Sequence, residues 1–197
     1  MNTHQFESEL NAFTAAQISA YTEQLKTLVR VPSISSKPEN KEEFEKILKE
    51  MEKIILPMGF SSRIIRAEKG NPSLIVTLPN PLSKEWVLIY NHMDVQPAEE
   101  KEWETDPFSP LEKDGALFGR GSTDDKGPAL SVVYAIKFLQ EQQKNNPEAM
   151  LPNIQLLYET EEEIGSPNFG AVLEVAKKEQ LLHTPNSILI SDTIFDG

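Results

Sequence analysis

The chain has 197 residues, of which 39% are hydrophobic and 25% are charged, which is enough for one well-buried domain and marginal for two. A formal net charge of −12 argues against binding to a nucleic-acid backbone. The chain has no cysteine, which excludes disulfides and thiolate chemistry, and no apolar run of transmembrane length, so no membrane partner is expected.

The N-terminal residues have neither a basic n-region nor an apolar h-region, so the sequence predicts no secretory signal and a cytoplasmic location. Two amphipathic helices are then predicted, because apolar residues recur three or four positions apart over residues 5–30 and 40–56. A break in the first helix is expected near Thr14. Pro32 and Pro38 separate the two helices, since proline does not continue a helix.

Short strands and helices alternate through the rest of the chain. Strands are predicted at residues 62–66, 73–78, 86–90, 154–158 and 187–190, with a turn and short strand at 113–118, and helices at residues 127–143 and 169–179. This alternation predicts an α/β fold with a largely parallel, twisted sheet and helices on both faces.

The predicted strand at residues 86–90 leads directly into His92 and Asp94. Residues two apart in a strand face the same side, so both side chains can point to one place beyond the sheet edge, where open α/β sheets bind ligands. Taken alone, the pair is better explained as a surface histidine beside a turn aspartate.

Three acidic clusters follow other predicted strand ends or the loops after them. They are GRGSTDDKG at residues 119–127, ETEEEIGS at residues 159–166, and Ser191-Asp192. The paired aspartates of the first cluster would also suit a helix N-cap. Carboxylates gathered at one edge, however, repel one another unless a cation lies among them. Histidine and carboxylate ligands without sulfur favour Zn²⁺ or Mn²⁺, with cobalt as a further alternative.

Together with HMDVQP at residues 92–97, these motifs resemble, in order and approximate spacing, the M20 family of zinc metallopeptidases. The similarity is greatest to its dipeptidase branch, the carnosinases and cytosolic nonspecific dipeptidases, through residues 95–98, 103–108 and 124–128. The resemblance implies hydrolysis of peptide bonds in dipeptides or short peptides with two divalent metal ions, zinc being expected ahead of manganese or cobalt.

The resemblance also implies a ligand set. His92 and Asp192 would bind one metal ion, Asp124 would bridge both ions, and Glu163 would bind the second. The peptide bond between Asp124 and Asp125 is expected to be cis.

Two further roles follow from the same resemblance. Glu162 would be the general base that takes a proton from a water bridging the metals, and Asp94 would orient the imidazole of His92. Residues 162–163 are expected to be extended, so that Glu162 and Glu163 point in opposite directions, one to the water and one to a metal.

Members of the family are longer than this chain. Residues 1–197 are therefore expected to be a partial catalytic domain, without the lid or dimerisation domain and without the C-terminal part of the catalytic domain. The resemblance implies that the absent part supplies a further histidine ligand to the second metal, and neither His4 nor His183 lies in a matching motif. The fragment alone is expected to be inactive or nearly so, and the full-length form to be a homodimer.

Two alternatives remain open from the sequence. One is an amidohydrolase of the same fold that acts on N-acyl amino acids. The other, from a different class, is a non-catalytic binding or assembly protein that keeps the fold, although Glu162 is present. A calcium-binding module is disfavoured, because no D-x-D-x-D-G loop occurs.

Overall fold

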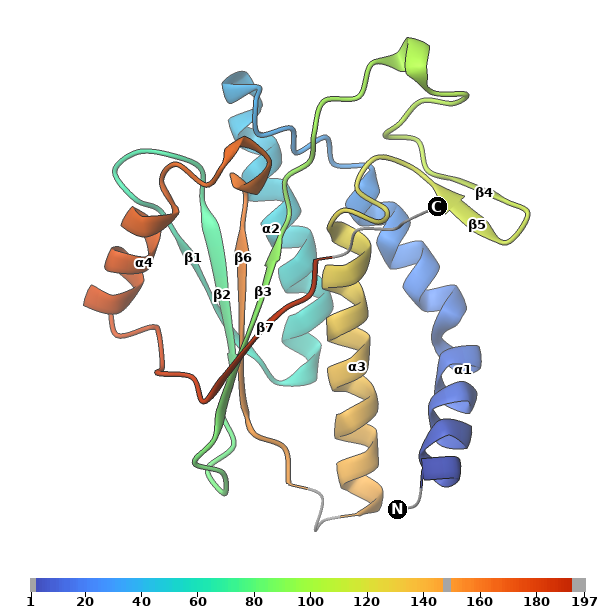
Figure 1. Cartoon of the computed structure of the whole chain (residues 1–197), viewed down its shortest axis with the longest axis vertical. Helices are drawn as coiled ribbons and strands as arrows, with labels where there is room; N and C mark the ends of the chain where they lie inside the picture. The colour runs from blue at the N-terminus through green and yellow to red at the C-terminus, as the bar shows by residue number, and fades with distance from the viewer. Residues whose placement is uncertain (1–2, 147–149, 193–197) are drawn as a thin grey trace.

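A computed structural model describes residues 3–146 and 150–192, which form a central sheet between two helical layers (Figure 1). One face is covered by α1 (Thr3–Val29), α2 (Lys41–Ile55) and α3 (Lys126–Asn145), and the other by α4 (Phe169–Lys178). The predicted α/β class with helices on both faces is confirmed. Within the described ranges, no helix combines the length and apolar character that a membrane span requires.

The sheet contains five strands in the order β1-β2-β6-β3-β7. Their bounds are β1 (Ser61–Ile65), β2 (Ser73–Leu78), β3 (Trp86–His92), β6 (Asn153–Glu159) and β7 (Ser187–Ile190). Crossovers through α3 and α4 make β3 parallel to β6 and β7, whereas β1 and β2 join antiparallel through a short turn, so the sheet is mixed.

Side chains alternate between the two faces of the sheet, as the strand period requires. Leu74 and Leu156 belong to the larger core against α1, α2 and α3, whereas Ile75 and Leu157 pack with α4. Each fully buried aliphatic side chain of this kind stabilises the fold by about 1.5–3 kcal/mol. Packing on both faces of the sheet therefore holds the strands in place.

Helix α1 runs without interruption past Thr14, so the predicted break there is wrong. Phe6 and Phe13 both pack on the ring of Phe138 in α3, with ring centroids 5.5 and 5.3 Å apart. The C-terminal residues of α1 enter the main core. Packing on both sides of Thr14 thus keeps the helix continuous, whatever the local pattern suggests.

Short elements connect the main ones. They are the 3₁₀ turns η1 (Pro38–Asn40), η2 (Leu56–Met58), η3 (Glu100–Glu102) and η4 (Glu162–Ile164), and the hairpin strands β4 (Leu111–Lys113) and β5 (Ala116–Phe118). Asp114 and Gly115, both with positive φ, form the hairpin turn, as in two-residue type I′ turns. The sequence predicted only a turn and one of these two strands.

The C-terminal ends of β3, β6 and β7 lie at one edge of the sheet, because these three strands are parallel. Strand β3 is two residues longer than predicted: Asn91 and His92 still pair with Tyr158 and Glu159 of β6. His92 is therefore the last residue of a strand rather than part of a loop. This edge carries the candidate site.

Candidate metal centre

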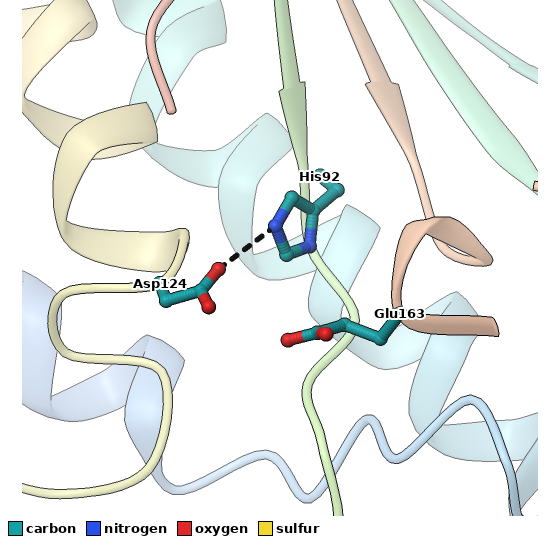
Figure 2. A group of neighbouring side chains, drawn as sticks. All are labelled: His92, Asp124 and Glu163. Carbon is teal, nitrogen blue, oxygen red and sulfur yellow. Dashed lines mark hydrogen bonds and ion pairs between the residues drawn. The ribbon is translucent and has the colours of Figure 1, made fainter. Parts of the chain in front are cut away.

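His92, Asp124 and Glu163 converge from three separate segments, as Figure 2 shows. His92 ends β3, Asp124 precedes α3, and Glu163 lies in η4 after β6. One donor atom from each lies within 4.8 Å of the others. The imidazole is fully buried, and its Nε2 is 3.0 Å from Oδ1 of Asp124. The sequence-predicted ligands His92, Asp124 and Glu163 are thus brought together.

Asp192 belongs to a second group at the same edge. Its carboxylate lies within 4.8 Å of donor atoms of His92 and Asp125. The resemblance put Asp192 on one metal with His92 and Asp124, and among the described residues Asp192 groups with Asp125 instead of Asp124. Asp192 itself is exposed.

A tight loop positions Asp124 before α3. The amide N–H of Lys126 donates to the carbonyl of Gly121 at 3.1 Å, and a Cβ added at Gly127 would lie 2.1 Å from the carbonyl oxygen of Ser122. The Lys126 side chain is fully buried, donates to the carbonyl of Val31, and has its pKa lowered to about 7 by burial. The bond between Asp124 and Asp125 is cis, as expected.

Asp94 is fully buried and makes contacts in two directions. Its Oδ1 lies 3.4 Å from Nδ1 of His92, and its backbone carbonyl oxygen lies 3.1 Å from the same nitrogen. Its two carboxylate oxygens also accept the backbone N–H groups of Glu162 and Glu163, at 3.2 and 3.0 Å. The sequence did not predict this second contact, which ties the acidic turn to the histidine strand.

Glu162 and Glu163 lie in the 3₁₀ turn η4, so the expectation of an extended segment is wrong. The Asp94 carboxylate satisfies the first two N–H groups of this turn and so favours its helical form. Oε2 of Glu163 accepts a hydrogen bond from Nε2 of Gln96 at 2.7 Å, and Oε2 of Glu162 lies 3.9 Å from Nε2 of His92. The side chains still separate, because successive residues of a 3₁₀ helix are a third of a turn apart.

The other two carboxylates of the acidic run are structural. Oε1 of the buried Glu159 accepts hydrogen bonds from the hydroxyls of Tyr90 and Ser166. Glu161 accepts the backbone N–H groups of Asn71 and Asn168, at 2.9 and 3.2 Å. Only Glu162 and Glu163 therefore face the candidate centre.

The pKa values at this edge indicate an excess of negative charge. Burial disfavours the charged form of His92, yet the hydrogen bond and charge of Asp94, with the charges of Asp125 and Asp124, raise its pKa to about 10. Burial raises the pKa of Asp125 to about 7 and also raises the pKa of Glu163, with a further contribution from the charge of Asp124. Groups in this arrangement favour a nearby cation.

The donor set fits a divalent metal. An imidazole nitrogen and carboxylate oxygens from separate segments match the ligands of Zn²⁺ or Mn²⁺. The side chain of Asp124 is 48% exposed, so the candidate centre is open to solvent on one side.

The remaining histidines lie elsewhere. His183 stacks on Trp86 with ring centroids 3.6 Å apart, at the opposite end of β3 from His92, and His4 is exposed on α1. Neither supplies a further ligand.

Two residues beside the candidate ligands were not predicted from the sequence. Asp125 occupies the N-cap position of α3 but makes no capping bond, and its Oδ2 accepts from the amide of Asn91 and the N–H of His92. The adjacent-aspartate motif was a signal for Asp125, but nothing in the sequence marked Asn91.

Comparison with known proteins gives relatives that include dipeptidases and N-fatty-acyl-amino acid synthase/hydrolases. Residues 88–193 match the model of Peptidase family M20/M25/M40. The chain is 38% identical over 128 residues to the Cys-Gly metallodipeptidase dug1 of Schizosaccharomyces pombe, covering 64% of this chain and 26% of that protein. It is 36% identical over 127 residues to the Beta-Ala-His dipeptidase of Rattus norvegicus, covering 63% and 24%.

The fold is also similar to that of a solved dipeptidase. The crystal structure of human carnosine dipeptidase 1 superimposes with a TM-score of 0.80 at 27% identity, over 95% of this chain and 41% of that one. The chain spans about a quarter of the length of the curated relatives it matches. Because the family model covers more than half of its residues, the chain belongs to Peptidase family M20/M25/M40.

Proposed function

We propose that the protein containing this chain hydrolyses the peptide bond of dipeptides or short peptides with the help of divalent metal ions. The observation that carries the proposal is the convergence of His92, Asp124 and Glu163 within 4.8 Å at the sheet edge. Membership of the peptidase family and similarity to proteins named dipeptidases support the substrate class.

We further propose two zinc ions. His92 and Asp192 would hold the first, Asp124 would be shared, and Glu163 would hold the second. When bound, such ions polarise a peptide carbonyl and lower the pKa of water toward neutrality. The number of ions and a homodimeric full-length form are proposed from the family resemblance, and the zinc identity from the resemblance together with the donor set. A cytoplasmic location is proposed from the sequence.

Glu162 is proposed as the general base. Its side chain is 40% exposed and its Oε2 lies 3.9 Å from the His92 imidazole, so it faces both the ligands and solvent. The carboxylate would accept a proton from the attacking water and return it to the leaving amine. Asp94 would keep Glu162 in place through the backbone N–H bond.

Metal content tests the ligand assignment. The chain purified without chelator should contain Zn²⁺ by elemental analysis, and Asp124→Ala should lose most of it, because the shared ligand is removed. Glu174→Ala, which removes an exposed carboxylate on α4, is the matched control and should keep the metal. Equal metal content in wild type and Asp124→Ala would refute the site.

The mechanism is tested by activity assays on the longest protein that is encoded by the gene for this chain. Glu162→Gln should keep its metal but lose about 10²–10⁴-fold in dipeptide hydrolysis, the usual contribution of a general base. Hydrolysis of N-acetyl amino acids in preference to dipeptides would favour the amidohydrolase alternative. No hydrolysis by a metal-loaded wild type would favour the non-catalytic alternative.

A further inference from the structure

We propose that Asn91 is a positioning residue for the first metal site, because its side-chain amide joins the segments that carry His92, Asp124 and Asp192. The inference rests on the proposed function, in which these three residues are the ligands of one ion. It assigns a role to a residue outside the four motifs.

The contacts of Asn91 define this role. Asn91 precedes the last residue of β3 and is 1% exposed. Its Nδ2 donates to Oδ2 of Asp125 at 2.8 Å and to the carbonyl oxygen of Ser191 at 2.9 Å. Each acceptor belongs to a residue that is next in sequence to a proposed ligand. One amide group thereby connects β3, the start of α3 and the end of β7.

The position requires an amide. Both partners of Nδ2 are oxygen acceptors, so the side chain must offer two N–H groups from one nitrogen atom. Oδ1 of Asn91 has no hydrogen-bond partner among the described residues, so the group acts here as a donor. Leucine would fill a similar volume without either donor, and serine would keep one.

The connection matters most for Asp192. The backbone bonding between β3 and β7 ends where the N–H of Ser191 donates to the carbonyl of Tyr90 at 3.3 Å. All four residues of β7 are exposed in the described part of the chain, so packing does little to hold the strand end. The amide of Asn91 adds a hydrogen bond to the carbonyl of Ser191, which follows the last backbone hydrogen bond between β3 and β7 and directly precedes Asp192.

On the other side, Asn91 acts on the segment of Asp124. Oδ2 of Asp125 accepts the N–H of His92 at 3.0 Å as well as the amide of Asn91. Two donors from β3 thus fix the residue that follows Asp124. Removing a residue that orients a metal ligand in this way typically weakens metal binding by about 10–100-fold.

The test compares Asn91→Leu and Asn91→Ser with Asn153→Leu in the metal-free chain, titrated with Zn²⁺ by calorimetry. Asn153 is a matched control, since it is 4% exposed and its Nδ2 donates to the carbonyls of Ser83 and Glu85, at 3.0 and 2.9 Å. It begins β6, at the opposite end of the sheet from His92.

Zn²⁺ affinity should fall about 10–100-fold in Asn91→Leu, fall less in Asn91→Ser, and stay unchanged in Asn153→Leu. The thermal midpoint should fall in both Asn91→Leu and Asn153→Leu, because each loses buried hydrogen bonds. Only the Zn²⁺ affinity therefore distinguishes a positioning role from a loss of stability. In an Asp192→Ala background, Asn91→Leu should have a smaller effect, because the two residues act on one site.

Unchanged affinity in both Asn91 variants would overturn the inference and leave the proposed function standing. A wild type that binds no Zn²⁺ would overturn the proposed function and the inference together.

Discussion

The buried Asp94 carboxylate connects the histidine strand and the acidic turn. It contacts the imidazole of His92 and accepts the N–H groups of Glu162 and Glu163. Hydrogen bonds to a charged acceptor each contribute about 1.5–3 kcal/mol, more than neutral ones. The positions of His92, Glu162 and Glu163 therefore depend on the side chain of Asp94.

Asp94→Asn tests this dependence. The amide has one acceptor oxygen for the two backbone donors, so at least one of these buried bonds is lost or reversed. We expect unfolding free energy to fall by about 1.5–3 kcal/mol and Zn²⁺ affinity to fall about 10–100-fold, measured by chemical denaturation and calorimetry.

Asp106→Asn is the matched control, because Asp106 also accepts a backbone N–H, that of Phe108 at 2.9 Å, but on an exposed loop. Its Zn²⁺ affinity should not change. Wild-type affinity in Asp94→Asn would show that Asp94 has no part in positioning the ligands.

At the scale of elements, the turn before β2 packs against the start of α4. Glu161 accepts the N–H groups of Asn71 and Asn168 from these two segments. Gly70 has a φ of +93°, and a Cβ added there would lie 2.6 Å from Cβ of Asn168. The close approach thus depends on glycine, both for its backbone conformation and for its missing side chain.

Gly70→Ala should therefore destabilise the protein through two effects. The positive φ costs about 1–2 kcal/mol, and the overlap adds about 1–3 kcal/mol. Gly115→Ala is the matched control, since Gly115 has a φ of +80° but nothing within 4 Å of an added Cβ. Chemical denaturation should show a larger loss in Gly70→Ala, and equal losses would exclude close packing at this turn.

At the scale of the whole molecule, the net charge of −12 is partly concentrated at the sheet edge. His92 belongs to two groups of potential metal ligands among the described residues. One group contains Asp124 and Glu163, and the other contains Asp125 and Asp192. Carboxylates held this close destabilise the folded chain unless a cation is present. Metal binding should consequently be linked to folding.

Zn²⁺ should raise the thermal midpoint of the chain. A ligand that binds only the folded state at 100 times its Kd stabilises by about 2.7 kcal/mol, which corresponds to a Tm increase of about 5–10 °C for a domain of this size. The increase should appear in calorimetric scans and vanish in Asp124→Ala. A Tm that is insensitive to Zn²⁺ and to chelator would contradict linkage between metal and fold.

The sequence by itself determined the α/β class, the order of the elements and most of the candidate ligands. Apolar periodicity marks strands and helices, because each element buries one face. His92 ends β3, Glu163 and Asp192 follow β6 and β7, and these three parallel strands end at one edge of the sheet, whereas Asp124 precedes α3. Local patterns placed these residues near one edge of the sheet, and the family resemblance supplied their expected roles as ligands.

Only the tertiary structure decided the supporting contacts. The amide of Asn91 reaches partners 34 and 100 residues away, and no local pattern encodes such pairs. The 3₁₀ turn at Glu162 depends on the distant Asp94, and the continuity of α1 depends on Phe138. Hydrogen bonds and packing between remote segments override local preference. A buried donor without a partner costs free energy, and its partner often belongs to a segment that is distant in the sequence.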